Sequence, residues 1–171
     1  MKNHPLILVG LLLFSTATAA FENENPEPVT TVRQRAQEVV PYDLGQALQT
    51  FTKTVHGGIQ HVVSKSPSNT REIEAIQAHL SKIADQYRKG DFSITERVHG
   101  SDMPGLTQLK TAKIDDIKFE YKALPNGAQI HYSTEYPQFV QALHEWFDAQ
   151  KIEHGNDVIQ EHSKHHSTPA E

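Results

Sequence analysis

Alternating apolar and polar positions occur in two separate parts of the chain. The runs TFTKTV and IQHVVS flank a His-Gly-Gly turn, and the runs DIKFEYKA and AQIHYST flank a Pro-Asn-Gly turn. A period of two is typical of half-buried strands, and Gly-Gly or Asn-Gly between two such runs favours a β-hairpin. The pattern therefore predicts two β-hairpins.

Each predicted hairpin is followed by a segment whose apolar residues recur every three or four positions, as on one face of a helix. The first stripe is Ile73, Ile76, Leu80, Ile83 and Tyr87, and the second is Phe139, Val140, Leu143, Trp146 and Phe147. Asn69 and Glu72 suit the start of the first helix, Gly90 suits its end, and Pro137 suits the start of the second. We predict an α+β fold in which two ββα repeats form a four-stranded antiparallel sheet with two helices on one face.

The ends of the chain differ in composition from residues 43–155, which we interpret as the α+β domain. Residues 1–20 combine an early lysine, a short apolar run and the small residues Ala-Thr-Ala, a pattern typical of a secretory signal peptide. Residues 21–42 are expected to be a polar N-terminal tether, and residues 156–171 a flexible His-rich tail. These features predict a periplasmic or secreted protein with no membrane span after signal cleavage.

Composition narrows the function further. The chain has no cysteine, which excludes disulfides, thiolate zinc sites and covalently attached c-type haem. Its net charge of −5 disfavours nucleic acid as a partner. The 11 histidines are numerous for 171 residues, and imidazole is a common metal ligand.

Comparison of the two repeats suggests that two histidines occupy core positions. With Gly58 aligned to Gly127, His61 takes the position of Ile130 and is expected to point inward, and His79 lies opposite Trp146 at the edge of the helical stripe. A buried imidazole needs hydrogen-bond partners.

Two interpretations of these histidines remain open at this stage. His61 can bond to a backbone carbonyl or to the hydroxyl of Thr52 or Thr54, or it can converge with His79 on a transition metal. A register shifted by one residue would turn His61 outward.

The segment HGSDMPGL lies in the long connection between the repeats. In this segment His99, Asp102 and Met103 lie close together in sequence, with glycines and a proline between and after them. Imidazole and thioether together form a ligand set suited to copper, with zinc as the next choice. Non-covalent haem is a third ligand for the same side chains. The alternative is that Met103 fills the core and Asp102 begins a turn. Weaker candidate metal ligands are His56, His162, His165 and His166.

Catalytic motifs are missing from the sequence: no GxSxG, HExxH or Walker loop is present. The sequence therefore favours a protein that binds a metal ion or small ligand over an enzyme. The alternative is a non-catalytic module that binds another envelope protein, with histidines in structural or pH-sensing roles.

Four segments, GDF, HGSDMPGL, LPNGAQIHY and ALHEWFDAQ, resemble those of a group of small exported bacterial proteins without an assigned activity. The resemblance covers most of residues 50–156 and implies a common folded unit and a periplasmic location. Some members carry the label aspartate carbamoyltransferase. We do not transfer this label, because the local similarity to that enzyme, SNTR at residues 68–71, is explained by helix capping.

Overall fold

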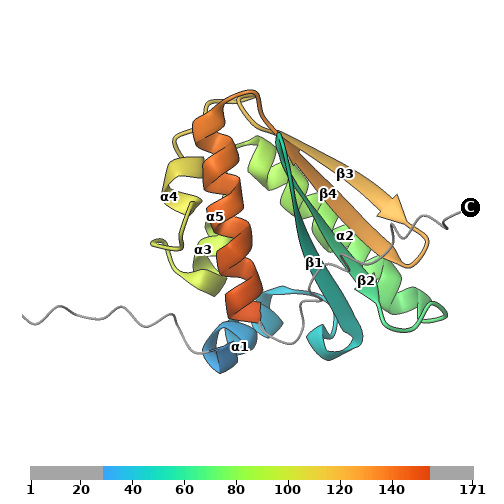
Figure 1. Ribbon diagram of the computed structural model, residues 1–171. Helices are drawn as coiled ribbons and strands as arrows, with labels where there is room; N and C mark the ends of the chain where they lie inside the picture. Colours follow the sequence, from blue (N-terminus) through green and yellow to red (C-terminus); the bar gives the residue numbers. More distant parts are fainter. Residues whose placement is uncertain (1–28, 155–171) are drawn as a thin grey trace, which may run out of the picture.

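The computed structural model describes residues 29–154 (Figure 1). In chain order its elements are α1 (Val29–Val39), the 3₁₀ helix η1 (Leu44–Gln46), β1 (Ala47–Thr54), β2 (Gly57–Ser64), α2 (Thr70–Arg88), α3 (Ser93–His99), α4 (Leu106–Leu109), β3 (Lys118–Leu124), β4 (Gly127–Ser133) and α5 (Pro137–His154). The predicted signal peptide and the predicted tail, with His162, His165 and His166, lie outside the described residues. Among residues 29–154, no helix is both long and apolar enough to cross a lipid bilayer.

The strands form one antiparallel sheet in the order β1-β2-β4-β3, which confirms the predicted α+β class. Both hairpins close through two-residue turns, with Thr54 paired to Gly57 and Leu124 paired to Gly127. The two central strands begin at Gly57 and Gly127, 70 positions apart. Gln60 and Ile130 are also 70 positions apart and pair directly with each other, so a pseudo-twofold axis passes between them.

Both long helices pack on the same face of the sheet, but each covers the hairpin of the other repeat. Helix α2 contacts mainly β3 and β4 and to a smaller extent β2, and α5 contacts β1 and β2. Matching hydrogen bonds fix this exchange. Gln77 donates to the Leu124 carbonyl at 2.9 Å, and His144 donates to the Thr54 carbonyl at 3.0 Å. Gln77 and His144 are each the eighth residue of their helix, and each acceptor is the last residue of an edge strand.

Tyr132 of β4 lies at the centre of the core and is fully buried. Its ring contacts Tyr87 of α2 and both Trp146 and Phe147 of α5, so this one side chain touches both helices. Its hydroxyl donates a hydrogen bond to Gln60 Oε1 at 2.7 Å. A buried hydroxyl without such a partner is costly, so this bond accounts for a glutamine on the inner face of β2.

Residues 21–42 were predicted to be a polar tether, and for residues 29–39 this prediction is wrong. Residues 29–39 form α1, which contacts α3 and α5 and buries Val32 and Ala36. The connection between the repeats also contains two short helices, α3 and α4. Helices that bury only two or three side chains leave too little periodicity to be detected in a sequence.

The segment HGSDMPGL proves to be a tightly packed connection between α3 and α4. Met103 is 3% exposed and belongs to the core, as the alternative interpretation expected. Gly105 has a φ of +78°, and a Cβ added there would lie 2.1 Å from the Ala142 carbonyl oxygen of α5. The glycine therefore allows the start of α4 to contact the backbone of α5.

We expect Gly105→Ala to lower the free energy of unfolding by about 3 kcal/mol, because it combines backbone strain with overpacking. Gly90→Ala is the matched control, since Gly90 also has a positive φ, +73°, but a Cβ there would meet no atom within 4 Å. The control should lose only about 1 kcal/mol. Equal losses in urea unfolding would show that the contact with α5 is unimportant.

Candidate functional site

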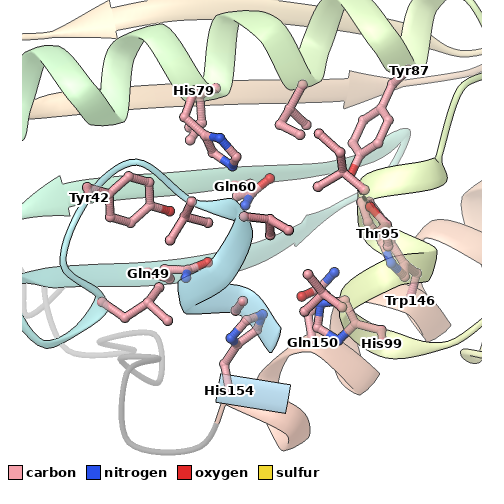
Figure 2. A pocket seen from close by; sticks show the side chains of 18 residues that line it. Tyr42, Gln49, Gln60, His79, Tyr87, Thr95, His99, Trp146, Gln150 and His154 are labelled. Carbon is pink, nitrogen blue, oxygen red and sulfur yellow. Dashed lines mark hydrogen bonds between the residues drawn. The ribbon is translucent and has the colours of Figure 1, made fainter. Parts of the chain in front are cut away.

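A cavity of about 70 Å³ opens on the inner face of the sheet, between the C-terminal halves of α2 and α5. Residues of α1 and α3 line its remaining sides. Its volume corresponds to about five water molecules. Its lining includes three glutamines, three histidines and a threonine, which come from both strands of the first hairpin and from three helices (Figure 2): Gln49, Gln60, His79, Thr95, His99, Gln150 and His154. None of the described residues that line it is Asp, Glu, Lys or Arg.

Two glutamine amides in this cavity have no protein partner. Gln49 and Gln150 are only 5% and 6% exposed, and neither side chain forms a hydrogen bond within residues 29–154. Trp146, which also lines the cavity, has a buried Nε1 without a partner in the same part of the chain. The fully buried indole N–H costs about 1–3 kcal/mol while it is unpaired. The two amides face the cavity, where water or a ligand can pair with them.

The repeats show why the space is hollow on this side of the axis. In the second hairpin, Phe119 stands where the first has Gln49, and in α2, Tyr87 stands where α5 has His154. Phe119 and Tyr87 pack with ring centroids 5.6 Å apart, and Phe92 stacks on Tyr87 at 4.7 Å. One side of the molecule is thus filled by aromatic rings, whereas the equivalent positions on the other side carry an amide and an imidazole.

The same substitution of polar for apolar residues continues along α5 and β2. Gln150 is the fourteenth residue of α5, and its equivalent in α2 is Ile83. Gln60 pairs with Ile130, its own equivalent across the axis. The polar lining is therefore a specific departure of one side from the apolar pattern of the other.

A buried histidine–carboxylate pair stands at the α3 end of the cavity. His99 Nδ1 lies 2.5 Å from Glu153 Oε2, and these side chains are 5% and 9% exposed. The ring of His154 meets that of His99 edge-on, with centroids 5.1 Å apart. Because Nδ1 of His99 is hydrogen-bonded to Glu153, only Nε2 of this ring can interact with a ligand. Nε2 makes no hydrogen bond within the described residues.

His79 lines the opposite wall of the cavity, where its ring lies edge-on to Tyr42. Burial lowers the pKa of His79 from 6.5 to about 4, and the Lys82 ammonium adds to the effect. Burial raises the pKa of the Tyr42 hydroxyl, and the Glu72 carboxylate raises it further. Both rings are therefore uncharged at neutral pH.

The expectation that His61 points into the core is wrong. His61 lies on the outer face of the sheet, where Nε2 is 3.1 Å from Gln129 Oε1 and Nδ1 is 3.4 Å from Thr50 Oγ1. The repeat alignment was shifted by one residue, because Gly57 and not Gly58 is equivalent to Gly127. In the correct register His61 corresponds to His131, and every strand residue changes face with a one-residue shift.

The five predicted core metal ligands do not come together in the structure. His79 and His99 line the cavity, Met103 is packed in the core, Asp102 is exposed, and His61 is on the other face of the sheet. The weaker candidate His56 is exposed in the turn of the first hairpin. Within residues 29–154, no group of three or more His, Cys, Asp or Glu side chains is arranged to hold a metal ion. Copper or zinc binding stays a prediction.

The sequence interpretation missed five residues of this site: Gln49, Gln60, Gln150, Glu153 and His154. The register that turned His61 inward places its neighbour Gln60 on the outer face. The sequence indicates a polar site only when the repeats are aligned in the correct register. Gln49 is then equivalent to Phe119, and Gln60 is equivalent to Ile130.

Comparisons with protein-family models, curated proteins and solved structures find no match. A function for this chain must therefore be inferred from the cavity itself.

We expect stability to fall as pH decreases from 6.5 to about 4 in a manner that depends on His79. Above pH 6.5 the ring is neutral in both the folded and unfolded states; between pH 6.5 and 4 the unfolded chain takes up a proton that the folded chain resists. The free energy of unfolding should drop by up to about 3 kcal/mol from this group. Urea unfolding across this pH range should show a shallower drop for His79→Gln.

The exposed His56 provides the control, because His56→Gln removes an imidazole outside the cavity. This variant should keep the pH dependence of the unaltered protein. If His79→Gln and His56→Gln behave alike, then burial of His79 does not contribute to acid sensitivity.

Proposed function

We propose that the protein is an exported binding protein that holds a small polar ligand in the cavity between α2, α5 and the first hairpin. The observation that carries this proposal is the pair of buried glutamines, Gln49 and Gln150, without hydrogen-bond partners in a cavity whose equivalent positions are apolar. A chain under no functional constraint would gain stability by filling this space as the other repeat does. Retention of the amides is expected where they bind something.

The walls of the cavity support a ligand with a polar and an apolar side. The sheet and α5 supply glutamine amides, whereas α1, α2 and α3 supply aliphatic side chains such as Val39, Leu80 and Val98. Ligand sites commonly combine a mainly apolar lining with a few polar groups that orient the ligand. The cavity volume limits the buried part of the ligand to a few heavy atoms.

Gln150→Ile tests the proposal, because it introduces into α5 the residue that α2 has at the equivalent position. Replacing the amide by an aliphatic side chain that fills the space should raise the free energy of unfolding by about 1–2 kcal/mol. The same variant should lose binding of small amides, alcohols and ketones from a fragment panel monitored by NMR. Chemical-shift changes of the Gln49 and Gln150 side-chain amides locate binding to the cavity.

Gln141→Ile is the matched control, because Gln141 lies on the same helix and is exposed. It should leave fragment binding unchanged. If no fragment shifts the amide signals of the unaltered protein, or if Gln150→Ile binds fragments as well as that protein, a ligand-binding role for the cavity is excluded. Cu²⁺ and Zn²⁺ belong in the same panel, since His79 and His99 line the cavity.

Export is the other part of the proposal and rests on residues 1–20 of the sequence. In a bacterial host, the full chain should be recovered from the periplasmic or extracellular fraction without its first 20 or so residues. Mass spectrometry of the purified protein measures the cleavage site. Replacing two leucines of the apolar run by arginine should retain the uncleaved chain in the cytoplasm; an intact N-terminus in the unaltered protein would contradict export.

A further inference from the structure

The polar groups of the cavity also indicate which class of small ligand it accepts, an inference that rests on the proposed function. Four groups without partners among the described residues surround the space: the amides of Gln49 and Gln150, the Nε2 atom of His99 and the Nε1 atom of Trp146. They come from β1, α5, α3 and α5 respectively. Figure 2 shows them around one hollow, together with His79 and Tyr42.

The histidine contributes a defined hydrogen-bonding role. Its Nδ1 faces the Glu153 carboxylate at 2.5 Å, and a carboxylate accepts hydrogen bonds, so the proton of a neutral ring resides on Nδ1. Nε2 is then an acceptor, and it needs an N–H or O–H group from the ligand. Glu153 is a positioning residue, because it acts on the ligand only through His99.

The two glutamines contribute a donor and an acceptor each. A group that carries both an N–H and a carbonyl, side by side, can satisfy such an amide with two hydrogen bonds. A carboxylate offers acceptors only and would enter a cavity lined by no Lys or Arg among the described residues, so its charge would be uncompensated. A ketone offers no donor to His99.

We infer that the cavity selects small neutral carboxamides, with the carbonyl and N–H groups bound by Gln49, Gln150 and His99 and a short aliphatic part against Leu80 and Val98. The aliphatic part is limited to a few carbons by the volume of about 70 Å³. A carboxamide presents an acceptor to a glutamine N–H and a donor to His99 Nε2 from two different atoms.

Three probes of nearly equal shape test this inference: isobutyramide, 3-methyl-2-butanone and isobutyrate. The amide has a donor and an acceptor, the ketone only an acceptor, and the carboxylate only acceptors and a charge. In NMR titrations at neutral pH, isobutyramide should bind about tenfold more tightly than the ketone, the difference expected for one satisfied hydrogen bond. Isobutyrate should bind more weakly than isobutyramide.

The double variant His99→Phe with Glu153→Leu isolates the contribution of the histidine. Both members of the pair are replaced by apolar side chains, so neither leaves a buried partner unpaired. In this variant the preference for isobutyramide over the ketone should fall from about tenfold toward none, while the ketone still binds. If the double variant fails to fold, His99→Asn retains a polar side chain of smaller size and should reduce the same preference.

The outcomes separate this inference from the proposed function. Ketone or isobutyrate binding at the cavity as tightly as isobutyramide overturns the carboxamide class and leaves a ligand-binding role intact. The same holds if other fragments shift the Gln49 and Gln150 amide signals and isobutyramide does not. Absence of cavity binding by these probes and by the whole fragment panel overturns both.

Discussion

The hydrogen bond from the Tyr132 hydroxyl to Gln60 is the contact on which the asymmetry of the molecule depends. Tyr132 is fully buried among rings from both helices, and burial raises the pKa of its hydroxyl well above 10, so the group stays protonated and needs an acceptor. The equivalent of Tyr132 in the first repeat is Val62, and the equivalent of Gln60 in the second is Ile130. A polar residue of the first repeat thus accepts a hydrogen bond from a hydroxyl of the second, across the pseudo-twofold axis.

Around that bond the two sides of the core have taken different forms. Tyr87, Phe92 and Phe119 fill one side with stacked and tilted rings, and this dense packing secures α2 on the second hairpin. On the opposite side, between α5 and the first hairpin, packing is less dense, and amides and imidazoles surround a cavity. Protein interiors are normally close-packed, so a hollow lined by unpaired polar groups lowers stability and is typical of a place that binds something.

The sequence predicted the hairpins, the long helices and their common face because each of these depends on periodicity within a few residues. The orientation of His61 depended instead on whether Gly57 or Gly58 is equivalent to Gly127, a choice between two adjacent glycines that local pattern does not resolve. The cavity was also missed, since Gln49 and Gln150 line the same space only because α5 lies on the hairpin of the first repeat. Such long-range placement is set by packing of the whole domain and is invisible in either segment alone.

The exchange of helices between the repeats has a consequence for the origin of this architecture. A lone ββα unit would leave much of its hairpin uncovered and much of the apolar stripe of its helix in water, because each helix lies mainly on the other unit's strands. Two identical ββα chains could cover both the hairpin and the helix stripe by forming a homodimer with a true twofold axis. In such a homodimer any substitution would appear in both subunits. Joining the two units in one polypeptide removes that restriction: one half can keep an aromatic core while the other keeps a polar cavity.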